Sequence, residues 1–180
     1  MTPPAQSISH YRPPANRTRF FFCALVALGY NPYMAAPHPR LIQALRETAY
    51  RMRQGSEYRW SNFGMCNCGH LAQTVTDKTP KEIHEAALER EGDWGQQALQ
   101  YCGQTGLEID TIIEELLGLG LTRLDIQAIE RLSDPKVRDR MGPVPTGVSH
   151  YARTDAILYF EAWADLLEEQ LPTEELLAAK

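Results

Sequence analysis

Apolar residues recur at three- and four-residue spacing along most of the chain. The first clear example begins at Pro39, where the spacing places one apolar face on a helix that Gly55 closes. The same spacing predicts further helices near residues 71–75, 80–90, 93–102, 108–117, 122–132, 135–141 and 149–171. No segment shows the clear alternation of a half-buried strand. The sequence therefore predicts an all-α fold, a compact multi-helix domain of about seven or eight helices with no substantial sheet.

Several of these helices begin with residues that cap helix N-termini. Thr79 can accept a backbone hydrogen bond, Pro80 suits the first helical position, and Glu82 completes a capping box. Ser149 is expected to cap the last long helix in the same way. These positions give the predicted boundaries a physical basis that does not depend on hydrophobic spacing.

The ends of the chain differ from its middle. Residues 1–38 are rich in proline and read as a poorly ordered N-terminal extension, or as upstream sequence before a true start at Met34. A short apolar run at 20–30 follows three arginines and has the outline of a secretory signal, but the Ala-x-Ala cleavage spacing is missing. We expect a single helical domain over residues 39–171 and a tail over 172–180.

Composition and charge narrow the class of protein. The chain has 180 residues, of which 43% are hydrophobic and 23% charged, as in ordinary globular domains. Its net charge of −5 argues against nucleic-acid binding, and no apolar run is long enough to span a bilayer. Residues 1–60 carry eight arginines and two acids, whereas acids dominate the rest. This split indicates either an anion-binding region or a basic helix packed beside acidic helices, and we favour the second interpretation.

The candidate chemistry is concentrated in one segment, Cys66-Asn67-Cys68-Gly69-His70. Zinc prefers thiolate and imidazole donors, and Cys66, Cys68 and His70 can converge on it if the backbone is not helical. Gly69 favours such a backbone, and Cys102 is the preferred fourth ligand, with His84 as a substitute. The prediction is a structural zinc that ties the 56–70 loop to residues 93–105, with function residing in an unidentified surface for a protein partner.

Other interpretations of the same residues remain open, including whether the protein is an enzyme. Cys68 at a helix N-terminus would have a lowered thiol pKa and could act as a nucleophile, with a histidine as base. Alternatively, the cysteines are buried core residues of a metal-free helical protein-interaction module. The four cysteines, Cys23, Cys66, Cys68 and Cys102, are too few and too poorly spaced for a disulfide scaffold, so we expect reduced thiols and a cytoplasmic location.

Overall fold

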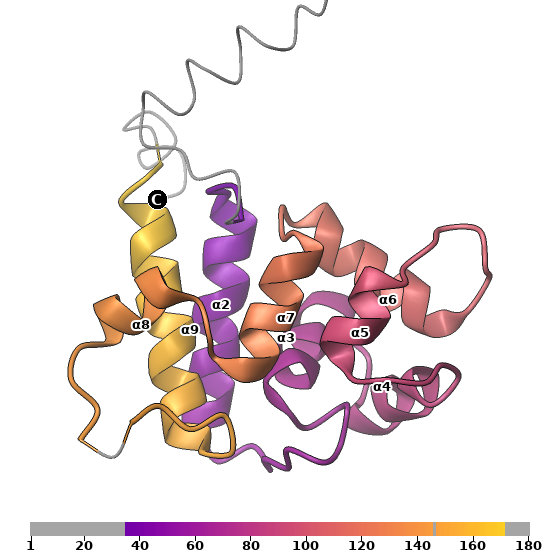
Figure 1. Cartoon of the computed structure of the whole chain (residues 1–180), viewed down its shortest axis with the longest axis horizontal. Helices are drawn as coiled ribbons and strands as arrows, with labels where there is room; N and C mark the ends of the chain where they lie inside the picture. Colours follow the sequence, from indigo (N-terminus) through magenta and orange to yellow (C-terminus); the bar gives the residue numbers. More distant parts are fainter. Residues whose placement is uncertain (1–34, 146, 172–180) are drawn as a thin grey trace, which may run out of the picture. The chain divides into compact units, whose positions relative to one another are not determined.

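The computed structural model describes residues 35–145 and 147–171, and within them the chain forms eight α-helices and no strand. The helices are α2 (Pro39–Arg53), α3 (Asn67–Thr76), α4 (Pro80–Ala87), α5 (Trp94–Leu99), α6 (Glu108–Gly118), α7 (Arg123–Arg131), α8 (Pro135–Met141) and α9 (Arg153–Glu168) (Figure 1). This confirms the predicted all-α architecture. The predicted N-terminal extension and C-terminal tail fall mainly on residues 1–34 and 172–180, which lie outside the described part of the chain.

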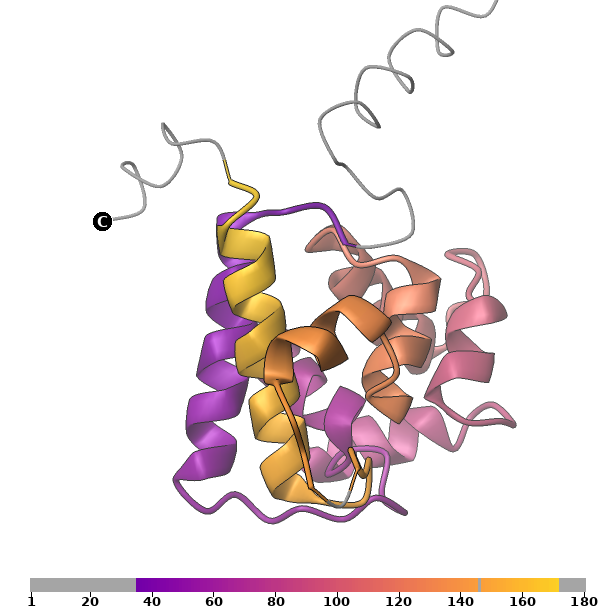
Figure 2. The same ribbon diagram turned by 60° about the vertical axis from the view of Figure 1, so that its left-hand side comes forward.

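Helices α2 and α9 lie side by side and antiparallel, as both ribbon views show (Figures 1 and 2). Arg46 of α2 pairs with Asp165 of α9 at 3.0 Å and with Glu168 at 2.5 Å. Arg53 pairs with Glu161 at 2.8 Å. The interpretation that a basic helix packs beside an acidic one is therefore confirmed for α2.

The helices share one buried core, and α3 runs through its middle. α3 packs against α2, α4, α6 and α7, so its residues are enclosed on several sides. Large side chains that are almost fully buried belong to the same core: Leu41, Leu45 and Met52 from α2, Trp94 from α5, and Tyr159, Phe160 and Trp163 from α9. The side chains at the start of α3, among them Cys66, Asn67 and Cys68, are consequently almost fully buried. Among the described residues, no helix combines the length and the apolar character needed to cross a bilayer.

The helix starts agree with the capping signals in most places. Capping boxes form at Thr79, Asp93 and Thr122. The expected cap at Ser149 is wrong, because the N-cap of α9 is Ala152 and residues 149–152 form a turn before it. Ser149 instead donates its backbone N–H to the Asp155 carboxylate at 2.8 Å. The Asp155 side chain of α9 thus fixes the turn before the helix, and the N-cap itself has no side-chain hydrogen bond.

Candidate functional site

The Cys-Asn-Cys-Gly-His segment is helical from its second residue. Cys66 is the N-cap of α3 with extended backbone (φ −83°, ψ −175°), and Asn67 begins the helix. The expected helix start near residue 71 was therefore too late. Residues two positions apart on an α-helix point about 200° away from each other. The non-helical backbone that the zinc prediction needs at 66–70 is absent, and Cys68 and His70 face different neighbours.

The four predicted zinc ligands are distributed over different surroundings. Cys66 and Cys68 are buried, whereas Cys102 is exposed in the loop after α5. His70 Nε2 lies 3.1 Å from the Glu57 carbonyl oxygen. Residues 35–145 and 147–171 contain no group of three or more His, Cys, Asp or Glu side chains placed to share a metal ion. The described chain does not gather this ligand set, and zinc binding stays a prediction.

Each member of the segment contacts a different neighbour. Asn67 donates from Nδ2 to the Glu130 carbonyl oxygen at 3.0 Å, and its Oδ1 accepts from the Tyr58 hydroxyl at 2.8 Å. The Cys68 thiol points to the Ile126 carbonyl oxygen at 3.3 Å. The segment thereby joins the 56–66 loop to α7, which is a structural role for residues that the sequence marked as chemical.

Burial also changes the acid–base properties of these side chains. It raises the pKa of the Cys66 thiol to about 12 and that of the Cys68 thiol well above its usual range. It lowers the pKa of His70 to about 4, so this imidazole is neutral near pH 7. A nucleophilic cysteine needs a lowered thiol pKa or an adjacent base. The surroundings of Cys68 provide neither, because its thiol faces a carbonyl oxygen and His70 contacts the backbone of another loop.

A cleft opens beside Cys66, between the 58–66 loop, the start of α5 and the end of α7. We call it the Trp60 cleft; it encloses about 180 Å³ and is lined by Trp60, Ser61, Phe63, Cys66, Asp93, Trp94, Glu130 and Arg131. Two side-chain donors, the indole N–H of Trp94 and the thiol of Cys66, point to the Phe63 carbonyl oxygen at 3.1 and 3.5 Å. One wall of the cleft is therefore the 58–66 loop, which leads directly into α3 and whose Phe63 carbonyl oxygen accepts both of these hydrogen bonds.

Glu130 supplies a buried carboxylate to this cleft. Its side chain belongs to a residue only 4% exposed, and its two oxygens accept the backbone N–H groups of Trp94 at 3.2 Å and Gly95 at 3.0 Å. Burial raises the pKa of this carboxyl group. Within the described residues no basic side chain forms an ion pair with it. The adjacent arginine, Arg131, pairs instead with Asp93 at 2.7 Å. The cleft thus holds a buried carboxylate without an ion-pair partner, which backbone N–H groups and, at longer range, the charge of Arg131 compensate.

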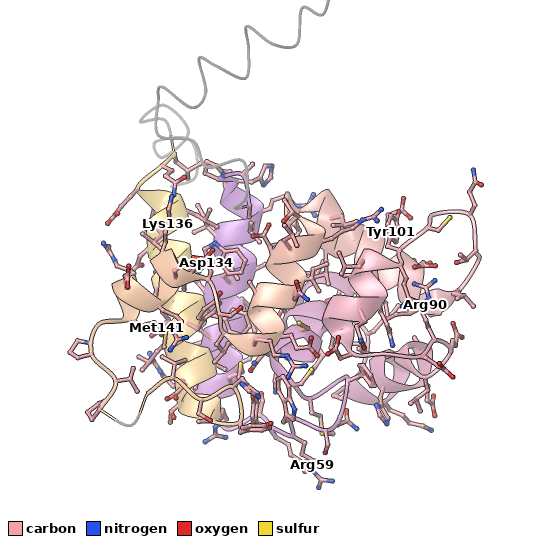
Figure 3. The ribbon with its side chains drawn as sticks, viewed as in Figure 1. Arg59, Arg90, Tyr101, Asp134, Lys136 and Met141 are labelled. Atoms are coloured by element: carbon pink, nitrogen blue, oxygen red, sulfur yellow. The ribbon has the colours of Figure 1, made fainter. Side chains whose placement is uncertain are left out.

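Aromatic rings and a cation form the rim. The Arg131 guanidinium carbon lies 5.4 Å from the centre of the Trp60 ring. The His150 ring packs against Trp60 at 4.4 Å, and the Tyr151 ring lies 5.4 Å from it. Arg59, on the same loop, points away from the helices (Figure 3). Trp60 is thus held between side chains of two other segments and presents part of its indole to the cleft.

Other hollows of the described surface differ from this cleft in one respect. A hollow of about 410 Å³ lies beside α8, and one of about 240 Å³ lies between α2 and the end of α3. Neither is lined by a buried charged side chain, whereas the Trp60 cleft contains Glu130. A buried charge is costly to maintain, so its presence in a cleft is a stronger sign of ligand recognition than volume.

The spacing and composition of the sequence point to no site role for Asp93, Trp94 or Arg131, and the zinc prediction does not include Glu130. A signal for Glu130 did exist, because it lies four residues after Ile126 and therefore on the apolar side of its helix. An acid at an apolar position predicts a buried carboxylate, but not its neighbours. Comparison with protein-family models, curated proteins and solved structures finds no match to this chain. The fold and the cleft define a small helical protein, and its function has to be inferred from its own geometry.

Proposed function

We propose that this protein is a non-catalytic binding module that receives a small polar group of a ligand in the Trp60 cleft. The observation that supports this most is Glu130, a buried carboxylate at a cleft with no ion-pair partner among the described residues. Such a group is costly in an unliganded protein, and a ligand that donates hydrogen bonds to it reduces the cost.

The lining favours binding over catalysis. Cys66 is the thiol in the cleft, and burial raises its pKa to about 12, so it is protonated near pH 7. No histidine or lysine is among the lining residues that could take its proton. The volume of about 180 Å³ is below the ~300–1,000 Å³ of pockets for drug-sized ligands. The cleft therefore suits a single functional group rather than a whole cofactor.

The three tryptophans allow a direct test. Trp60 and Trp94 line the cleft, whereas Trp163 is 1% exposed in the core on α9. We expect at least one of two small probes, n-butylguanidinium and n-butyrate, titrated separately into ¹⁵N-labelled protein, to shift the indole N–H signals of Trp60 and Trp94 and to leave Trp163 unchanged. If no probe shifts these two signals selectively, the proposed binding site is wrong.

Two variants of α7 provide a matched pair for this titration. Glu130→Gln removes the charge at the cleft, and Asp125→Asn removes a second buried acid of the same helix, which accepts from the Thr122 backbone and hydroxyl. Asp125 does not line the cleft. Probe affinity should change in Glu130→Gln and not in Asp125→Asn; an equal change in both would mean that the effect reflects stability and not the cleft.

A further inference from the structure

We propose that the group recognised by the Trp60 cleft is a cation, an alkylammonium or guanidinium, and that the Arg131 side chain takes its place over Trp60 when no ligand is bound. This inference rests on the proposed function, since it names the ligand chemistry of the same cleft. It makes Arg131 an internal, displaceable substitute for the ligand.

The charges of the lining are the first support. Two carboxylates, Asp93 and Glu130, face the cleft, and Arg131 is its one basic side chain. Arg131 pairs with Asp93 at 2.7 Å, so the Glu130 carboxylate feels its charge only at longer range and has no ion-pair partner among the described residues. An added anion would face this carboxylate in a partly desolvated site, and like charges repel strongly there. An added cation would meet an unpaired opposite charge.

The position of Arg131 is the second support. Its guanidinium carbon lies 5.4 Å from the centre of the Trp60 ring, within the range of a cation–π interaction. The same side chain bonds to a carboxylate oxygen of Asp93. An aromatic face combined with a carboxylate is the pair of groups that binds ammonium and guanidinium ligands. The protein thus already holds a cation of the inferred type at this position.

The exposure of this pair is the third support. The Arg131 and Asp93 side chains are 45% and 35% exposed, and ion pairs at such exposure contribute little to stability. Arg131 is also the last residue of α7, so its side chain can turn toward solvent without disturbing the helix. A ligand cation can therefore replace it at small cost and gain the additional contact with Glu130.

The test compares Arg131→Gln with Arg123→Gln. Both arginines are on α7 and exposed, and Arg123 lies 5.4 Å from the centre of the Tyr101 ring, away from the cleft. Binding of n-butylguanidinium is measured from the Trp60 and Trp94 indole signals. We expect Arg131→Gln to bind it more tightly, by up to about fivefold, because a weak internal competitor is removed. Arg123→Gln should match the wild type, and Glu130→Gln should bind more weakly.

A second arm identifies the source of the cation. The free probe is compared with the peptide acetyl-Gly-Arg-Gly-amide; equal affinity indicates a free small cation, and tighter peptide binding indicates an arginine side chain of a polypeptide. Both results agree with the inference, because both require recognition of the cation.

Other outcomes would overturn it. If n-butyrate binds and Arg131→Gln abolishes that binding, the cleft is an anion site; the inference is then wrong while the proposed binding function stands. If guanidinium binding is unchanged in both Arg131→Gln and Glu130→Gln, the cation binds without these residues and the inference fails. If neither probe binds to any variant, the proposed function fails as well. Arg131 is exposed, so its variant is expected to fold even if Glu130→Gln does not.

Discussion

At the scale of single residues, Gly69 shows most clearly what the first turn of α3 demands. A Cβ atom at this position would lie 2.1 Å from the Phe63 carbonyl oxygen and 2.5 Å from the Gly64 carbonyl carbon. These are backbone atoms of the loop that forms the cleft, and they cannot move aside without shifting the loop. Glycine is needed here because two backbone segments touch, and not for the unusual backbone angles that a metal site would require.

Gly69→Ala should therefore destabilise the protein, although alanine normally favours helices. We expect a loss of at least about 2 kcal/mol in the free energy of unfolding, since overpacking of this severity forces backbone movement. Gly118→Ala is the matched control, because Gly118 is also helical and nothing lies within 4 Å of its added Cβ. That control should gain up to about 1 kcal/mol. Urea unfolding of both variants measures the difference, and equal effects would contradict the close contact.

His70 leads to a pH dependence with a definite sign. Its Nε2 contacts a carbonyl oxygen, which places the proton of the neutral ring on Nε2, and burial lowers its pKa from 6.5 to about 4. Below pH 6.5 the unfolded chain takes up a proton that the folded chain resists. The free energy of unfolding should therefore fall as the pH decreases from about 6.5 toward 4, by up to about 3 kcal/mol.

The comparison that isolates this effect uses His70→Gln, whose amide can still donate to Glu57 but does not titrate. Denaturant unfolding of both proteins between pH 7 and pH 4 should show a smaller decrease in stability for the variant. Parallel pH profiles would show that His70 is not protonated preferentially in the unfolded chain.

At the scale of helices, α2 and α9 combine an apolar interface with a row of ion pairs. Leu45 is fully buried on α2, whereas the adjacent Arg46 is 45% exposed in its pairs with Asp165 and Glu168. Exposed ion pairs contribute about 1 kcal/mol or less, while buried leucine side chains contribute several times more. The charges thus neutralise the arginines of α2, and the apolar side chains provide most of the attraction.

This division predicts unequal effects for two neighbouring substitutions. Leu45→Ala should lower the free energy of unfolding by about 2–5 kcal/mol, because it leaves a cavity in the core. Arg46→Ala should lower it by less than about 1 kcal/mol, and the loss should shrink further at high salt. Thermal unfolding at low and high ionic strength distinguishes them. A large, salt-dependent loss for Arg46→Ala would mean that the ion pairs hold the two helices together.

Capping residues in the sequence decided whether the starts of α4 and α3 were predicted correctly. The helix after Thr79 began where expected, because its cap, its proline and its glutamate are adjacent in sequence. α3 begins at Asn67, earlier than predicted. Its N-cap, Cys66, makes no side-chain capping hydrogen bond, so the sequence contains no capping residue that would indicate this start. Its first turn is stabilised by contacts with α7, which is remote along the chain.

At the scale of the whole molecule, the zinc hypothesis predicts a metal content that can be measured. A structural zinc at Cys66, Cys68, His70 and Cys102 predicts about one zinc per chain in protein purified without a metal-affinity tag. Replacing Cys66 and Cys68 with serine should then remove the metal and lower the melting temperature together.

Native mass spectrometry with elemental analysis measures the metal, and calorimetry measures the melting temperature. Cys102→Ser is an informative control, because Cys102 is exposed and a serine in its place should not disturb the core. If Cys102→Ser retains both metal and stability, Cys102 is not a ligand. Wild-type protein without zinc would support the interpretation of Cys66 and Cys68 as buried core residues.

The sequence by itself determined the helical class, the positions of most helices and the paired charges of α2, because spacing, caps and composition act over a few residues. It also marked residues 66–70 as unusual. Only the tertiary structure decided that Cys66 borders a cleft with Trp94 and Glu130, which lie 36 residues apart. Burial, and with it the high thiol pKa and the unpaired carboxylate, arises when distant segments exclude water together, and no local pattern encodes that.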